Sequence, residues 1–170
     1  MIYLRLFIAL LFEKETVAKL CSEIDELKKQ GVNGNFTKRE NLHLTLAFIG
    51  EYPDFRKVGE IVKRSGFENF ALTFGKCSAF GDIIVRNINC PKELYDYVYS
   101  LRTELRNAGV PFDGKKFVPH ITLVRKADRL CFPSNEGSVA RPSRVALMKS
   151  ERGRDGMIYT ELFSVKAKES

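Results

Sequence analysis

One short motif occurs twice in this chain, and its repetition constrains the fold more than any other feature. The only two histidines each begin a His-x-Thr-Leu motif, HLTL at residues 43–46 and HITL at residues 120–123. The two copies lie nearly half a chain length apart in 170 residues. In each half the histidine follows a predicted strand, a predicted helix and a glycine, Gly31 or Gly109. We therefore expect a strand–helix–strand lobe that is duplicated once, rather than a longer repeat array.

Within each motif the histidine and the threonine are two residues apart, which is the period of a β-strand. Side chains at that spacing lie on the same face of a strand, so His43 and Thr45 share one face while the flanking leucines pack the other. His120 and Thr122 repeat this arrangement. A pseudo-two-fold relation between the lobes would bring both faces together across one groove.

The remaining hydrophobic pattern is typical of a chain with both helices and strands. It predicts strands at residues 4–10, 42–48, 70–74, 83–88 and 117–124, and a C-terminal hairpin of residues 145–149 and 158–165. It predicts helices at residues 16–30 and 54–64, and from Pro91 to Gly109. No linker or low-complexity tract interrupts the pattern, and residues 128–142 are rich in loop-forming residues. We expect a single domain over residues 1–170, because a chain of this length can bury two small lobes that share an interface.

Composition narrows the class of protein and its environment. Hydrophobic residues make up 44% and charged residues 29%, which excludes disordered, collagen-like and coiled-coil proteins. The net charge of +7 favours a polyanionic partner, nucleic acid before an anionic membrane. The four cysteines are widely separated, so reduced thiols in the cytoplasm are expected rather than disulfides or a metal site. The apolar start, residues 2–12, contains Arg5 and precedes charged residues, which predicts a buried strand rather than a signal peptide.

A pair of histidines, each beside a threonine, suits phosphodiester chemistry. One neutral imidazole can deprotonate an attacking water while the opposite imidazolium protonates the departing oxygen. The threonine hydroxyls can donate to the non-bridging phosphate oxygens, whose charge must be stabilised in the transition state. His43, His120, Thr45 and Thr122 are therefore the candidate catalytic residues, and their chemistry needs neither metal nor cofactor. A single histidine in an apolar strand is usually a core residue, but the matched pair favours catalysis.

These motifs resemble those of the two-histidine phosphoesterases, and especially the RNA 2′,3′-cyclic phosphodiesterase family, formerly called 2′-5′ RNA ligases. The resemblance spans nearly the whole chain and rests on RLFIAL at residues 5–10, ENLHLTLAFIG at 40–50, FVPHITLVR at 117–125, LMKS at 147–150 and Tyr-Thr at 159–160. It implies an α+β, bilobal duplicated fold. Each lobe would hold an antiparallel-rich sheet with helices, and a pseudo-two-fold axis would pass through a central groove.

The resemblance also implies an activity, which is hydrolysis of a terminal RNA 2′,3′-cyclic phosphate to a 2′-phosphomonoester without metal or cofactor. By position, His43 matches the family's proton donor and His120 its proton acceptor, although the near-identical motifs do not themselves distinguish these roles. Thr45 and Thr122 match the hydroxyls that contact phosphate. We expect a cytoplasmic monomer that acts on RNA, with no membrane association and no obligate protein partner.

Four further side chains are candidates for substrate binding. Arg125 follows the second motif and could hold phosphate through its forked guanidinium. Strict alternation from His120 places Arg125 on the opposite face, so the strand must end or bulge there. Arg152 in the last turn could contact the RNA backbone, and Phe7 and Tyr159 could stack on a base. Their plainer interpretations are a surface arginine, a solvated hairpin tip and core aromatic residues.

Three alternatives stay open from the residues alone. The chain could be a phosphodiesterase for small cyclic nucleotides or 2′-5′ linked oligonucleotides, which a closed neutral pocket would favour over basic residues beyond the groove. It could be a non-catalytic RNA-binding module on the same fold, although two complete motifs argue against this. ATP-dependent ligation lacks support, because the chain has no glycine-rich phosphate loop and no nucleotidyl-lysine motif.

Overall fold

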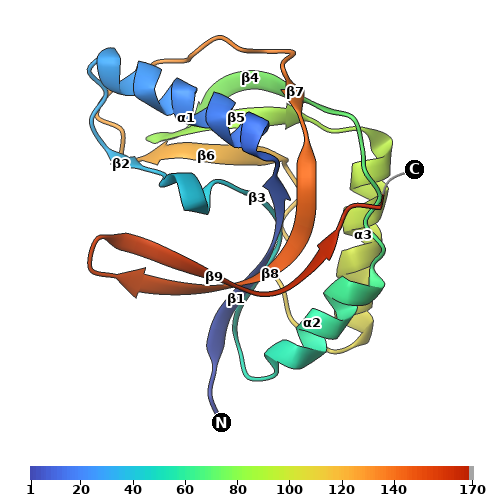
Figure 1. The fold of residues 1–170 in the computed structure, drawn as a ribbon. Coiled ribbons are helices and arrows are strands. Elements are labelled where there is room, and N and C mark those ends of the chain that lie inside the picture. The colour runs from blue at the N-terminus through green and yellow to red at the C-terminus, as the bar shows by residue number, and fades with distance from the viewer. Residues whose placement is uncertain (169–170) are drawn as a thin grey trace.

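The computed structural model describes residues 1–168 as a mixed α and β fold (Figure 1). The helices are α1 (Lys14–Lys29), α2 (Phe55–Arg64), α3 (Lys92–Asn107) and the short 3₁₀ turn η1 (Arg39–Asn41). The strands are β1 (Leu4–Phe12), β2 (Asn35–Phe36), β3 (Leu44–Tyr52), β4 (Leu72–Phe80), β5 (Ile83–Asn89), β6 (His120–Arg125), β7 (Val139–Ala140), β8 (Pro142–Gly153) and β9 (Gly156–Lys166). Each predicted helix and strand has a counterpart, although β4 continues six residues beyond the predicted end at residue 74. The short elements β2, β7 and η1 were not predicted.

The named strands form one antiparallel sheet that divides into two halves. The strand order is β7-β4-β5-β6-β3-β1-β8-β9, and β2 pairs with β6. The junction between β6 and β3 consists of a single residue pair, Leu44 with Ile121. Each of these residues directly follows a motif histidine, so the two motifs meet where the two half-sheets meet. The expected bilobal, antiparallel-rich α+β fold is confirmed.

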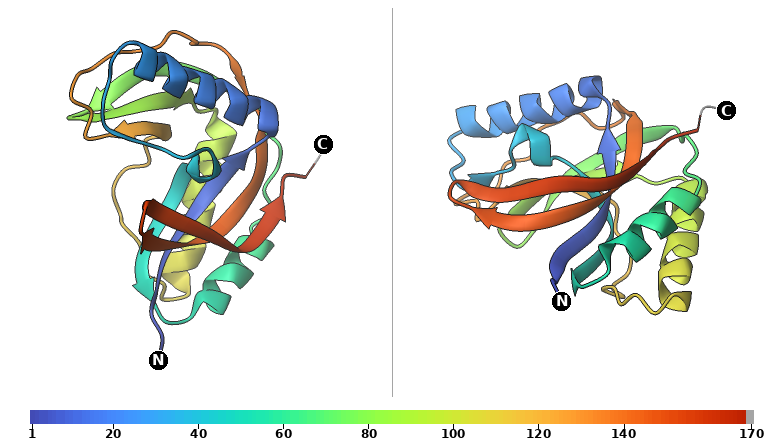
Figure 2. Two further views of the ribbon diagram at one scale, coloured as in Figure 1. Left: turned by 60° about the vertical axis from the view of Figure 1, so that its left-hand side comes forward. Right: turned by 60° about the horizontal axis from the view of Figure 1, so that its bottom comes forward.

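The two halves exchange their helices. Helix α1 follows β1 in the chain but packs against β6, while α3 follows β5 and packs against β3. Figures 1 and 2 show α1 over β4, β5 and β6, and α2 and α3 over the other half of the sheet. One continuous core cluster runs through both halves and includes Ile8, Leu44, Phe74 and Ile121. The first strand is buried as predicted, with Ile8 0% exposed.

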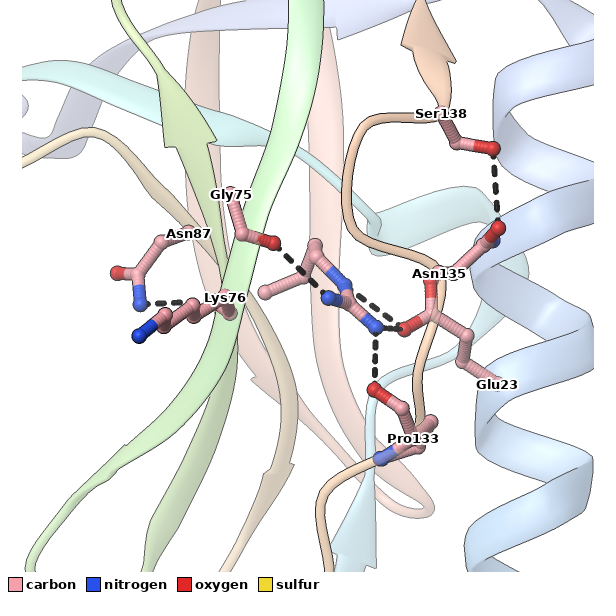
Figure 3. A network of polar contacts seen from close by, with 8 residues as sticks. Glu23, Gly75, Lys76, Asn87, Pro133, Asn135 and Ser138 are labelled. Carbon is pink, nitrogen blue, oxygen red and sulfur yellow. Dashed lines mark hydrogen bonds and ion pairs between the residues drawn. The ribbon is translucent and has the colours of Figure 1, made fainter.

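A buried ion pair fastens α1 to the strand beside the second motif (Figure 3). Arg86 on β5 and Glu23 on α1 are 1% and 3% exposed, and the Nε of Arg86 donates to Glu23 Oε1 at 2.8 Å. The guanidinium also donates to the carbonyls of Gly75 and Pro133, at 3.0 and 2.8 Å. Burial raises the pKa of Glu23 above its ordinary value, although Arg86 opposes this. Because Arg86 pairs with Ile121 across the sheet, this cluster supports the strand that carries His120.

Two further expectations concern the thiols and the membrane. All four cysteines are free, as predicted. Among residues 1–168, no helix combines the length and the apolar character that crossing a membrane requires.

Candidate active site

The side chains of each motif separate between the two faces of their strand, as the spacing predicts. His43, directly before β3, and His120, the first residue of β6, are half-exposed. Thr45 is exposed and Thr122 half-exposed, whereas the intervening Leu44 and Ile121 are 0% exposed, as core residues. The backbone therefore presents both histidines and both threonines outside the core, at the junction of the half-sheets.

Both imidazoles are held by the same kind of hydrogen bond. His43 Nδ1 lies 2.7 Å from the carbonyl oxygen of Asn41, and His120 Nδ1 lies 2.6 Å from that of Val118. Each carbonyl belongs to the residue two positions before its histidine. Because a carbonyl only accepts, Nδ1 carries the proton in both rings, which leaves Nε2 as the nitrogen for proton transfer. The two halves thus reproduce the same ring orientation and the same tautomer.

The surroundings of His43 favour its neutral form. Burial lowers the pKa of His43 below its ordinary value, the hydrogen bond to Asn41 opposes this, and the positive charges of Arg125 and His120 lower it further. The Nε2 atom lies 3.0 Å from Thr45 Oγ1, so the threonine hydroxyl donates to the neutral ring. Both of these charged groups come from β6, the strand that joins β3 at the junction of the two half-sheets.

Two matching bulges follow the motif threonines. Leu46 is the extra residue in the pairing of β3 with β1, since Thr45 pairs with Ala9 and Ala47 with Ile8. In the same way Leu123 is extra in the pairing of β6 with β5. Each bulge turns the fifth residue after its histidine back toward the face of that histidine. The sequence required β6 either to end or to bulge at Arg125, and the structure shows both, a bulge at Leu123 and the strand end at Arg125.

The β3 bulge also places an aromatic residue that the sequence analysis missed. Phe48 pairs with Phe7 and packs against the same small hydrophobic cluster, which lies on the face of His43. The signal that could have identified it is its spacing, because Phe48 stands at the same distance in sequence from His43 as Arg125 does from His120. One half of the site therefore carries an aromatic ring where the other carries a cation.

Aromatic rings surround His43 on two sides. The centroid of the His43 ring lies 5.0 Å from that of Phe7 and 5.4 Å from that of Tyr159. The centroids of the Phe7 and Tyr159 rings are 4.9 Å apart. Phe7 is only 4% exposed, so its ring supports His43 and offers no open face to a base. Tyr159 is half-buried beside the histidine. The ring of His120 contacts that of Phe80, with 5.2 Å between the ring centroids. Phe80 is 46% exposed, and it too was not predicted as a site residue.

A basic groove lies next to His43. It has a volume of about 480 Å³, and its lining includes the candidate residues Arg125, Arg152 and Tyr159. The groove also contains Asn41, whose carbonyl holds His43. The structure thus brings three of the four predicted substrate-binding residues to one groove, and it places the fourth, Phe7, against the ring of His43.

Comparisons with known proteins identify the family of this chain. A family model described as the 2′-5′ RNA ligase superfamily matches residues 16–154. The chain is 33% identical over 135 residues to the RNA 2′,3′-cyclic phosphodiesterase of Thermotoga maritima, covering 72% of this chain and 70% of that protein. It is 27% identical to the protein of the same name from Methanothermobacter thermautotrophicus, over 81% of this chain and 85% of that protein.

Solved structures show the same fold. The apo form of LigT from E. coli superposes with a TM-score of 0.80 at 23% identity, covering 98% of this chain and 99% of LigT. The protein TT0787 of Thermus thermophilus superposes with a TM-score of 0.79 at 24% identity, covering 95% and 97%. The family model covers most of the chain, and the membership predicted from the paired histidine motifs is confirmed: this protein belongs to the 2′-5′ RNA ligase superfamily.

Proposed function

We propose that this protein hydrolyses RNA 2′,3′-cyclic phosphate ends to 2′-phosphomonoesters, with His43 and His120 as acid and base. The observation that carries the proposal is the matched pair of imidazoles, each with Nδ1 fixed by a carbonyl and each beside a threonine. The names of the curated relatives support the substrate. The basic lining of the groove favours RNA over a small cyclic nucleotide.

The reaction follows from two Nε2 atoms on either side of one phosphate. The neutral imidazole takes a proton from water, whose oxygen attacks phosphorus, and the bond from phosphorus to O3′ breaks. The opposite imidazolium gives its proton to O3′, so the phosphate remains on O2′. Thr45, Thr122 and Arg125 donate to the non-bridging oxygens as their negative charge grows. Each step uses a protein side chain, so the mechanism includes no metal.

The assignment of acid and base depends on the bound phosphate. The family resemblance gives His43 the role of acid, yet burial and nearby cations lower its pKa and favour the neutral ring before substrate binds. A phosphate anion beside Nε2 stabilises the charged ring and raises that pKa. We therefore propose that His43 gains its proton when substrate binds, and that the Thr45 hydroxyl then turns from Nε2 to a phosphate oxygen.

The direct test is incubation with an oligonucleotide that ends in a 2′,3′-cyclic phosphate, followed by identification of the terminal group. We expect a 2′-phosphomonoester, no joined product, and the same rate after dialysis against a chelator. The variants His43→Ala and His120→Ala serve as controls for contaminating activity. If a chelator abolished turnover and a divalent ion restored it, the two-histidine mechanism would be wrong.

We also propose that the enzyme acts as a cytoplasmic monomer. Both histidine motifs come from one chain and meet at one junction, so the site needs no residue from a second copy. The four free cysteines fit a reducing compartment. Analytical ultracentrifugation and localisation of the tagged protein in cells test these two points.

A further inference from the structure

The basic groove beside His43 carries more positive charge than one terminal phosphate requires. Four cationic side chains line it, against a single carboxylate, Asp155; the cations are Lys38, Arg125, Lys126 and Arg152. Ion pairs elsewhere in residues 1–168 neutralise several surface arginines and lysines, but none of those pairs includes these four. Unpaired cations gathered around one hollow repel each other, and an anionic ligand relieves that repulsion.

Three separate segments build the groove. The turn of the β8–β9 hairpin contributes one wall, and the stretch from β2 to η1 with the end of β6 contributes the other (Figure 1). The strand β2 docks on β6, where Asn35 pairs with Arg125. A side chain at Gly34 would place its Cβ 2.8 Å from the carbonyl oxygen of Arg125, so only glycine allows this close approach. Across the groove, Lys38 Nζ approaches the hairpin at Gly156.

The backbone at Lys126 is strained in a way that serves the groove. With φ of 55°, Lys126 is the only residue other than glycine in the left-handed region among those described. The next two residues are tied down, because Ala127 N donates to the Asp82 carbonyl and the Asp128 carboxylate accepts two bonds from Asn33. Such strain persists only where the surroundings impose it, and it gathers at ligand sites. Here it places a lysine on the groove directly after Arg125.

The groove is continuous with the catalytic histidine. Tyr159 lines the groove and contacts the ring of His43, and Asn41 lines it while its carbonyl holds His43 Nδ1. A strand whose terminal phosphate lies at His43 therefore has the adjoining groove within reach of its next phosphate. Arg125 borders both positions, since its charge acts on His43 while its side chain lines the groove.

We propose that this groove, through Lys38 and Lys126, binds the phosphodiester that precedes the terminal nucleotide, so that the enzyme selects RNA ends over cyclic mononucleotides. This inference rests on the proposed function, because it assumes that the cyclic phosphate is cleaved between His43 and His120. On this proposal the enzyme prefers an RNA strand because the positive charges of Lys38 and Lys126, which are not catalytic residues, bind its second phosphate.

The test compares three substrates that share the same terminal nucleotide. They are a 2′,3′-cyclic mononucleotide, a dinucleotide with a terminal cyclic phosphate, and the same dinucleotide with a neutral methylphosphonate linkage. For the wild type we expect kcat/KM on the charged dinucleotide to exceed the other two about tenfold, the effect of one charge-assisted contact. Lys38→Gln and Lys126→Gln should each reduce the ratio of kcat/KM on the charged dinucleotide to kcat/KM on the other two substrates several-fold. The control is Lys57→Gln, which should leave this ratio unchanged, because Lys57 is an exposed lysine on α2 outside the groove.

A binding measurement supplies a readout other than turnover. The affinity for a dinucleotide product ending in a 2′-phosphate should fall with salt, and each lysine removed should reduce the slope of log K against log salt by about 0.7. If the wild type cleaved all three substrates equally well, the groove would not be the second phosphate site, and the proposed function would stand. If it cleaved none of them, the proposed function would be wrong and the inference would fall with it.

Discussion

Replacement of Thr45 by valine tests the chemistry of the site with the smallest change of shape. The hydroxyl lies 3.0 Å from His43 Nε2 in the free enzyme, and it is exposed on the sheet rather than part of the core. Valine keeps the branched shape and the strand propensity, so we expect the free energy of unfolding to change by less than about 0.5 kcal/mol. Any large effect on catalysis then belongs to the hydroxyl group itself.

The expected magnitude follows from the role of the hydroxyl in the transition state. One donor aimed at a developing oxyanion is worth about 2.7–4 kcal/mol, so kcat should fall about 100- to 1,000-fold. KM should change far less, because the charge that this donor stabilises develops only as the water attacks. Removing the hydroxyl also removes the hydrogen bond that the neutral ring of His43 accepts, so protonation of His43 becomes easier in the free enzyme.

Single-turnover cleavage of an oligonucleotide with a 2′,3′-cyclic end measures the chemical step directly. Thr160→Val is the matched control, because Thr160 is an exposed threonine on β9 that pairs with Lys149 at the sheet edge. Thr122→Val should repeat the loss from the opposite half of the site. Unchanged single-turnover rates in both motif variants would refute the reasoning and leave the hydroxyls with a structural role only.

The remaining predictions concern the histidines and the buried ion pair. An aryl phosphodiester needs no protonation of its leaving group, so His43→Ala should retain more activity on it than on RNA, whereas His120→Ala should lose both; equal losses would contradict this assignment of acid and base. NMR titration should find the pKa of His43 below its ordinary value and rising when inorganic phosphate binds. Arg86→Met should cost about 3–5 kcal/mol near pH 7 in urea unfolding, because it leaves the Glu23 carboxylate buried without its partner. Since the pKa of Glu23 in the folded protein is already raised, that cost should be smallest at low pH, where the carboxyl is neutral, and should grow as the pH rises.

Much of the site was predictable because it depends on local alternation. The period of two placed His43 and Thr45 together and the leucines in the core, and the structure agrees. Strict alternation put Arg125 on the face opposite His120, and the bulge at Leu123 turns it back to the face of His120. Local patterns of this kind require no knowledge of what lies across the sheet.

Other features depend on contacts between distant segments and leave no local signal. Phe7 was a reasonable candidate for base stacking by residue type, but Tyr159 and His43 pack against its ring. The exchange of α1 and α3 between the half-sheets arises only when the whole sheet assembles, so we expect the chain to unfold as one domain, in one cooperative transition. Lys38 and Lys126 lie far apart in sequence, and they line the same groove because β2 docks on β6.

The two motifs are nearly the same in sequence, yet a hydrolysis that proceeds by acid and base needs two different imidazoles. The two imidazoles are alike in orientation, because in both rings Nδ1 donates to a backbone carbonyl and Nε2 is left for proton transfer. The surroundings differ, because the rings of Phe7 and Tyr159 pack against His43, whereas His120 has the exposed Phe80 as its neighbour. At the fifth position after each histidine, matching bulges present Phe48 on one side and Arg125 on the other. Phe48 in turn lies under the guanidinium of Arg5, whose carbon is 4.8 Å from the ring centroid, so its half of the site carries a cation on an aromatic ring. We infer that this difference in surroundings is what would let two rings of the same orientation take different roles, one as acid and one as base.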